Sequence, residues 1–370
     1  MIIMDKQELI RKLKNGEDVN LDVKRDEYGY TVLTWVNDRI DLTDSDLSGI
    51  EFSNKRLSYV DFTGSKLDGV KFNNCNIRTC KFDDCSIEHT SFNGAIIDNV
   101  TMDNVVMSET SFIDTEIHGL KITRGLIHKL DFSHLAKIKH IVLWFYDTEI
   151  YNCCFDNIQA RIAVNGCIIK KCSFNATTFT DANSRTAGND NFTSSYIEET
   201  NFNKAKFNVT EYDEIFTNSK LLIVNMYEAD IEFLKIENAS LRNVDISDAK
   251  VGNNIYFKNC SIVNFASIGV SGSITFDDTN LSNGIMTGMN ASSLKFKDAY
   301  VLKTNFDKTN IRDWFLSMST FKLCTMNSMV IDNLNVERPV AFLVDDESKF
   351  TCAKNKNIEV TKWVDEFDDN

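Results

Sequence analysis

The chain has 370 residues and a formal net charge of -14. Such an acidic balance disfavours direct binding of nucleic acid, which needs a basic face, and 43% hydrophobic residues exclude a disordered chain. One proline and only 15 glycines exclude a fold built on conventional tight turns, such as a β-sandwich or an antiparallel barrel.

Residues 1–39 are predicted to form an N-terminal cap. A short helix is expected over 5–14, where Asp5 and Glu8 fit a capping box and Gly16 can end the helix. The apolar face of this helix, and the aromatic residues expected to pack beneath the first repeats, comprise Leu9, Ile10, Leu13, Tyr28, Tyr30 and Trp35.

The apolar run at the N-terminus is too short for a secretory signal, and no stretch approaches the ~20 apolar residues of a membrane span. Ten cysteines in such a chain indicate a reducing compartment. We therefore expect a cytoplasmic protein, or one that acts in the cytosol of a host cell if it is a secreted effector.

An internal repeat begins at Leu42, from which every fifth residue is large and apolar as far as Phe132. This run has nineteen members without a miss, a period that neither a helix nor a strand produces. The residue two positions earlier is often small, as at Ser65, Cys75 and Ala95, and the others are mostly polar. Each five-residue unit is thus expected to bury two side chains.

A longer period within this run fixes the number of sides. Phenylalanines recur every twenty residues, so four five-residue sides make one coil, and like residues should stack in coils about 4.8 Å apart. The expected core column is Phe52, Phe72, Phe92, Phe112 and Phe132. The pattern resumes repeatedly up to residue 336, with breaks near 133–149, 180–191 and 208–219.

Several units match the pattern A(D/N)Lxx, including SDL at 45–47, ADI at 229–231 and TNF at 304–306. The chain therefore resembles the pentapeptide-repeat family over about 40–336. The resemblance implies an all-β fold, a right-handed quadrilateral β-helix that forms a solenoid, closed by the helical cap at 1–39 and an irregular cap at 337–370.

The breaks are candidate recognition sites, because loops that leave a rigid scaffold often carry function. In 133–149, either a wider coil is filled by Trp144 or Phe145, or Trp144, Phe145 and Tyr146 form a binding segment. The polar insertion at 180–191 is expected to protrude, with Asn183 and Arg185 as candidate contacts.

The segment 337–370 contains the single proline, Pro339, and ends in the acidic run DEFDDN. It is interpreted either as a cap with a frayed tail or as a dimerisation element. The second interpretation follows from the resemblance to topoisomerase-targeting family members, which pair through that end, and it would make the protein a homodimer.

No pattern points to catalysis. The five histidines lie between 89 and 140, but His118 and His128 are half a coil apart and should face opposite sides. Eight of the ten cysteines occupy the small buried position, where a thiol behaves as a small hydrophobe. We expect no enzyme activity, no metal and no cofactor.

One side of the predicted helix is acidic, and it is diluted by Lys81. Such a side can imitate the charge ladder of duplex DNA, although solubility alone would also explain it. The first hypothesis is a DNA mimic that inhibits or protects a DNA-processing enzyme such as a topoisomerase, a nuclease or a phage-defence enzyme, and the alternative is a protein-interaction scaffold such as a secreted bacterial effector. The acidic side comprises Asp41, Asp44, Asp61, Asp83, Asp84 and Asp103.

Overall fold

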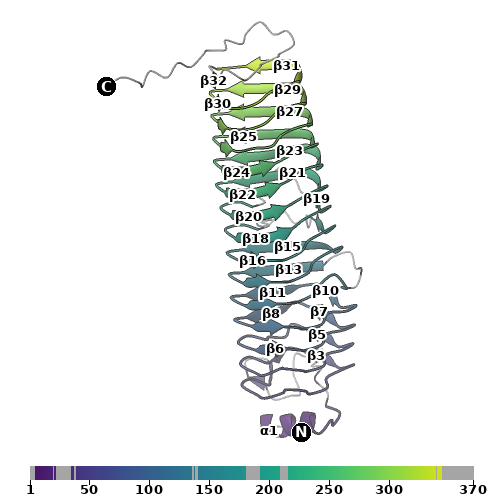
Figure 1. Ribbon diagram of the computed structural model, residues 1–370. Coiled ribbons are helices and arrows are strands. Elements are labelled where there is room, and N and C mark those ends of the chain that lie inside the picture. The colour runs from purple at the N-terminus through teal and green to yellow at the C-terminus, as the bar shows by residue number, and fades with distance from the viewer. Residues whose placement is uncertain are drawn as a thin grey trace, which may run out of the picture. The chain divides into compact units, whose positions relative to one another are not determined.

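The computed structural model divides into two compact units, Met1–Ala182 and Asn183–Asn370, called unit 1 and unit 2 below. In each unit, short strands stack one upon the next in parallel coils (Figure 1). The structure describes residues 5–19, 21, 35–36, 39–135, 137, 141–180, 192–208, 216–338 and 340–343.

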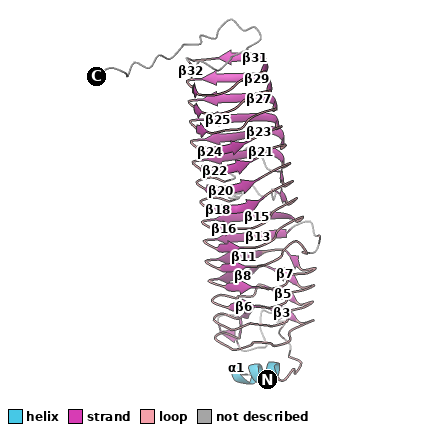
Figure 2. Cartoon of the chain, in the orientation of Figure 1, coloured by secondary structure: helices cyan, strands magenta, loops and turns pink. Residues whose placement is uncertain are grey.

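Unit 1 begins with the helix α1 (Lys6–Lys14), drawn in cyan in Figure 2. Its N-cap Asp5 accepts a hydrogen bond from the Glu8 backbone N at 2.8 Å, so half of the predicted capping box forms. The Glu8 carboxylate pairs with Arg11 at 2.7 Å instead of returning to Asp5. Gly16, with φ +70°, follows the last turn, as the sequence indicated.

The cap is attached to the first coil by polar contacts. Lys6 Nζ lies 3.3 Å from Asp41, and Lys55 Nζ lies 2.8 Å from Asp18. On the expected apolar face Leu9 and Leu13 are buried, while Ile10 is half-buried; Tyr28 and Tyr30 fall outside the described residues, and the Trp35 backbone belongs to a strand.

The strands of unit 1 form four sets, all parallel except for one antiparallel pair, β1 with β2. The first two sets are β1 (Trp35–Val36), β2 (Arg39–Asp41) and β4 (Val60–Asp61), and then β3 (Arg56–Ser58), β5 (Asn76–Arg78), β7 (Ile96–Asp98) and β10 (Glu116–Ile117). The third set is β8 (Val100–Asp103), β11 (Leu120–Thr123), β13 (Ile141–Tyr146), β15 (Gln159–Asn165) and β17 (Thr178–Thr180). The fourth is β6 (Ser86–Glu88), β9 (Val106–Ser108), β12 (Leu126–His128), β14 (Glu149–Tyr151) and β16 (Ile168–Lys170).

Unit 2 contains two sets of parallel strands, several of them longer than any strand of unit 1. One is β19 (Lys206–Asn208), β21 (Asp230–Glu237), β23 (Lys250–Lys258), β25 (Ser271–Asp277), β27 (Asn290–Lys297), β29 (Asn310–Ser317) and β31 (Val330–Val336). The other is β18 (Tyr196–Asn201), β20 (Lys220–Asn225), β22 (Ser240–Asp245), β24 (Ser261–Ala266), β26 (Asn280–Ser282), β28 (Tyr300–Leu302), β30 (Thr320–Lys322) and β32 (Ala341–Leu343). The all-β solenoid predicted from the repeat is therefore confirmed.

The corners of the coil explain the shortage of glycine and proline. The residue two positions after most central apolar residues adopts a left-handed conformation, as at Asn54 (φ 65°) and Asn74 (φ 54°). Asn and Asp tolerate this conformation better than other non-glycine residues, and they also stack: Asn74 Nδ2 donates to Asn54 Oδ1 at 3.3 Å. Side-chain ladders thus replace the conventional turns.

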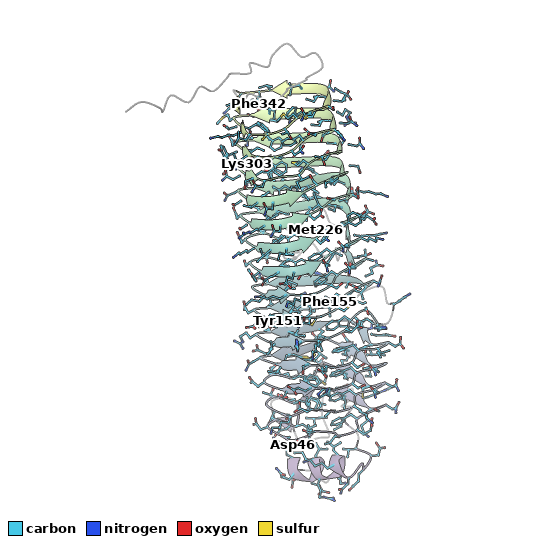
Figure 3. The ribbon with its side chains drawn as sticks, viewed as in Figure 1. Asp46, Tyr151, Phe155, Met226, Lys303 and Phe342 are labelled. Carbon is cyan, nitrogen blue, oxygen red and sulfur yellow. The ribbon has the colours of Figure 1, made fainter. Side chains whose placement is uncertain are left out.

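The inward register is confirmed, since every central residue from Leu42 to Phe132 is buried. Phe92 stacks between Phe72 and Phe112, with ring centroids 5.0 and 5.2 Å away and nearly parallel planes. The column continues to Phe155, which is labelled in Figure 3. Consecutive rings are held one coil apart by the parallel backbone pairing.

The break at 133–149 is an insertion of three residues into one coil. Leu120 of β11 aligns with Leu143 of β13, an offset of 23 instead of 20, and the next coil has an offset of 19. In unit 2 each full coil keeps three left-handed corners. The fourth corner is formed inside a continuous strand, for example where Glu232 and Phe233 of β21 both face outward next to a register shift.

Most of the other irregular segments fall outside the described residues, namely 181–191, 209–215 and 344–370, together with Pro339. The C-terminal boundary placed at 336 is too early, because β32 pairs in parallel with β30 and extends the coil to Leu343. Phe342 stacks on Phe321 with centroids 4.9 Å apart, so it belongs to the core.

Candidate functional site

The six acidic residues singled out from the sequence lie on one side of unit 1, because the coil-to-coil register aligns them. Asp41 aligns with Asp61, and Asp61 with Lys81. Asp83 and Asp103 are joined in neighbouring coils, since the Asp103 backbone N donates to Asp83 Oδ1 at 3.0 Å. The remaining two members occupy left-handed corners of the same side, at Asp44 and Asp84.

Several of these carboxylates also bond to the scaffold. Asp41 Oδ1 accepts from the Thr43 backbone N at 3.0 Å and lies 3.3 Å from Lys6. Burial raises the pKa of the Asp41 carboxyl, but these partners outweigh it and the pKa falls below its usual value. At Asp83 burial dominates and raises the pKa.

The acidic character is strongest at the corners. Asp103 forms an ion pair with Arg124, which offsets its charge, whereas Asp44 and Asp84 are exposed. Asp84 keeps one contact with the next coil, because Asn104 Nδ2 donates to its Oδ1 at 2.7 Å. A partner approaching this side therefore meets the corner carboxylates first.

The aromatic candidates at 144–146 belong to the regular strand β13. Phe145 is only 1% exposed and packs edge-to-face on Phe155, 6.0 Å away, so its assignment as a partner contact is wrong. Alternation along the strand instead directs Trp144 and Tyr146 outward, where both are half-buried. The wider-coil interpretation therefore holds for Phe145. Asn183 and Arg185 lie outside the described residues.

Asp103 of the acidic side and the two outward aromatic residues share one sheet, a juxtaposition that the sequence did not reveal. β8 pairs with β11, and β11 with β13. Lys121 of β11 lies over the Tyr146 ring, with Nζ 5.2 Å from the centroid. The Asp103 carboxylate on β8 is thus followed by a cation on β11 and two aromatic rings on β13.

The family model described as pentapeptide repeats, in eight copies, matches residues 38–74 and 61–99. The chain carries pentapeptide repeats. These matched residues form coils in which every corner that bears a side chain is left-handed, so the resemblance inferred from the sequence is confirmed over residues 38–99.

Three solved structures are similar to this chain. HetL, a pentapeptide repeat protein of the cyanobacterium Nostoc sp. strain PCC 7120, is 10% identical over 84% of this chain and 94% of its own, with a TM-score of 0.17. QnrB1, a plasmid-mediated fluoroquinolone resistance protein, is 10% identical over 46% and 90%, with a TM-score of 0.21. The periplasmic alginate epimerase AlgG is 10% identical over 79% of each chain, with a TM-score of 0.31. Likenesses at this level carry no argument about function.

No curated protein sequence matches the chain.

The small buried positions of the pentapeptide repeats make a bond that sequence reasoning missed. Many of these hydroxyls and thiols donate to the backbone carbonyl of the central residue one coil back, as from Ser65 to Leu42 O (2.6 Å), Cys75 to Phe52 O (3.0 Å) and Thr90 to Leu67 O (2.6 Å). The preference for Ser, Thr and Cys over Ala at this position was the available signal. These bonds tie successive coils together inside the core.

Burial raises the pKa of the Cys75 thiol to about 11 and that of Cys85 to about 12. The folded chain therefore holds these protons more tightly than the unfolded chain, and the stability this confers is present below the unfolded value, near 9, and lost as pH rises through the folded values. We expect the urea midpoint to fall between pH 9 and 11. Replacing Cys75 and Cys85 by Ala should flatten this dependence, and an unchanged slope would contradict it.

Among the described residues no group of three or more His, Cys, Asp or Glu side chains could hold a metal ion. His134 contacts Asp131 at 3.1 Å, and His128 contacts Asn152 at 3.0 Å. His140 falls outside the described residues.

Within the part of the chain that the structure describes, no helix is long and apolar enough to cross a membrane.

Proposed function

We propose that this chain is a non-catalytic binding protein whose acidic side imitates DNA and occupies the DNA-binding surface of a DNA-processing enzyme in the cytosol. The observation that carries the proposal is the alignment of six carboxylates on one side of unit 1, from Asp41 to Asp103. Parallel coils hold these charges at fixed spacing, so a basic surface can bind them without ordering a flexible chain.

The spacing supports imitation of a short stretch of DNA. Four coils at about 4.8 Å per step span about 14 Å, and six carboxylates over that length approach the charge density of a duplex, about one per 1.7 Å, without reaching it. Lys6, Lys81 and Arg124 reduce the net charge. The imitation is therefore partial, and we expect binding weaker than that of a duplex of the same length.

The test is a pull-down from bacterial lysate at low and high salt, with competition by duplex DNA and identification by mass spectrometry. Capture of a topoisomerase or nuclease that is lost in salt and displaced by DNA supports imitation, because exposed charges are screened within about 8–10 Å at physiological salt. Capture of only salt-resistant partners that ignore DNA contradicts it.

A matched pair of variants assigns the effect to this side. Asp44→Asn combined with Asp84→Asn removes two exposed corner charges and should weaken the captured complex about tenfold, since charge complementarity contributes mainly to encounter and specificity. Asp114→Asn combined with Glu88→Gln removes the same charge from other sides of unit 1 and should leave affinity unchanged. Equal loss with both pairs would refute a specific acidic site.

A second candidate function, a protein-interaction scaffold, is favoured by the outward rings of Trp144 and Tyr146, since Trp and Tyr dominate many protein interfaces. Under this alternative, Trp144→Ala abolishes capture of a salt-resistant partner, while the corner charge variants have no effect. The same pull-down, repeated with Trp144→Ala, separates the two candidates.

A further inference from the structure

Unit 2 concentrates exposed apolar side chains on one side of its coils. Five large ones lie there: Ile223 (49% exposed), Tyr227 (37%), Ile268 (44%), Ile285 (47%) and Leu323 (37%). Single exposed apolar residues are ordinary on protein surfaces, but a cluster on one side marks an interaction site. This side, the six-coil face, comprises residues 223–228, 243–248, 264–269, 283–288, 303–308 and 323–328.

Backbone pairing aligns the six coils of this face, so that residues at equivalent positions form columns that run from coil to coil. Asp245 aligns with Ala266, Ala266 with Ile285, and Ile285 with Asn305. In the corner column the Asp248 N bonds to Ile268 O and the Gly269 N to Thr287 O, which places Asp248, Gly269, Gly288 and Lys308 one coil apart. The charge at this corner thus changes from acidic in the second coil to basic in the fifth.

The opposite corner of the face is an amide ladder. Asn264 Nδ2 donates to Asn243 Oδ1 at 2.8 Å, and Asn283 Nδ2 donates to Asn264 Oδ1 at 3.3 Å. The next member of this column is Lys303, which is labelled in Figure 3. The apolar centre is therefore bordered by amides on one edge and by the two glycines on the other.

We propose that the six-coil face is the self-complementary interface of a homodimer in which a second copy docks face to face and antiparallel. The two-fold axis runs across the face between the third and fourth coils. It places the second coil of one copy opposite the fifth coil of its partner and keeps each column opposite itself. An interface of this kind uses the same patch on both copies.

This two-fold axis places opposite charges of the two copies against each other. Asp248 lies opposite Lys308 of the other copy, and the symmetry makes that ion pair twice. Asp245 lies opposite Asn305, so this carboxylate meets a hydrogen-bond donor. Asp307 lies opposite Ser247, which is uncharged. Among the described residues of the two faces, no like charges oppose each other.

The same axis also matches the shapes. The large Ile285 lies opposite the small Ala266, and Ile268 lies opposite Thr287, so that large side chains meet small ones as in a packed core. At the ends of the face, Ile223 lies opposite Leu323. The paired glycines at the corner, Gly269 and Gly288, carry no side chains to hold the copies apart.

A parallel arrangement of the two copies fails on charge. It would place each column opposite the other corner within the same coil, so that Lys303 would face Lys308 of the partner in two symmetric positions. Because like charges across an interface disfavour binding, the antiparallel arrangement is preferred.

The size of the face predicts a weak, reversible dimer. Six coils at about 4.8 Å and a width of about 15 Å give an area on the order of 400 Å² per copy, about half of a standard interface. We therefore expect sedimentation velocity on the full chain to show a monomer–dimer equilibrium that depends on concentration. A chain that stays monomeric at all concentrations would overturn the proposal.

Charge-swap variants test the orientation. Asp248→Lys and Lys308→Asp should each raise the dissociation constant at least tenfold, because each places like charges in contact twice. An equimolar mixture of the two should dimerise, since the introduced lysine of one variant then meets the introduced aspartate of the other, and the second pair keeps its native residues. Failure of the mixture to associate would overturn the antiparallel pairing.

Apolar variants test the location of the interface. Ile285→Asp should abolish the dimer, whereas Val330→Asp, at a position 50% exposed on β31 outside the face, should leave it unchanged. Circular dichroism would verify that both variants remain folded. A dimer that resists Ile285→Asp would refute the six-coil face and favour pairing through 337–370, the region named from the sequence.

Discussion

Replacement of Phe92 by Ala is expected to destabilise unit 1 by about 3–5 kcal/mol, among the largest effects of any single substitution in this unit. Phe92 is fully buried, and its ring stacks on Phe72 and Phe112 at 5.0 and 5.2 Å. It also meets Phe82 edge-to-face at 6.4 Å. Because the coil spacing is set by backbone pairing, neighbouring coils cannot collapse into the cavity. Urea unfolding followed by circular dichroism measures the loss.

Ile113, one residue after Phe112 and 48% exposed, provides the control. Ile113→Ala removes a large apolar side chain from the outer surface, and we expect a change within about 0.5 kcal/mol. A loss near zero at Phe92, or equal losses at both positions, would contradict the inward register of the phenylalanine column.

Gly272→Ala is expected to be the second large effect, destabilising unit 2 by about 2–4 kcal/mol. Gly272 lies at the bulged corner of β25 with φ +110°, a conformation that side-chain-bearing residues rarely adopt. A Cβ there would lie 2.1 Å from the Val251 carbonyl oxygen. That oxygen belongs to the backbone of the preceding coil, so relief requires the strand itself to shift. Thermal unfolding of the variant measures the cost.

Gly288 is the matched control in the same unit. It has φ +64°, and a Cβ there would meet nothing within 4 Å. Gly288→Ala should therefore cost only the left-handed strain, about 1–2 kcal/mol. If the two glycine variants lost equal stability, the close approach at Gly272 would not be the cause.

The period of the sequence was sufficient to predict the solenoid, because each position of a five-residue repeat faces either the core or the solvent in every coil. The central residues from Leu42 to Phe132, and later ones such as Phe276 and Phe306, are all buried as the register required. The helix at α1 was also predictable, since a cap and an apolar face are local signals. The right-handed sense of the coil stays a prediction of the family resemblance.

Prediction from the repeat failed where a coil gains or loses residues. At 133–149 an apolar-aromatic run indicated a candidate binding segment, but the side chains of β13 alternate between the core and the surface, and Phe145 is buried. A three-residue insertion shifts the register for one coil, and the period alone does not show how the chain absorbs it. The end of the solenoid was also placed too early, because β32 joins its sheet by backbone pairing that needs no five-residue pattern.

The repeat alone was enough to specify the coil, its core and the sides on which charged residues lie, because each of these follows from position within a period of five and twenty. Which charges are offset and which surfaces are continuous depended on the folded coils. Asp103 bonds to Arg124 from the next coil, Trp144 and Tyr146 share a sheet with Asp103 of the acidic side, and Ile268 and Ile285 lie in adjacent coils of one face. Successive coils range from 19 to 24 residues in length, and these lengths decide which residues become neighbours. Only the backbone pairing between coils shows the lengths, because a strict period of twenty assumes that all coils are equal.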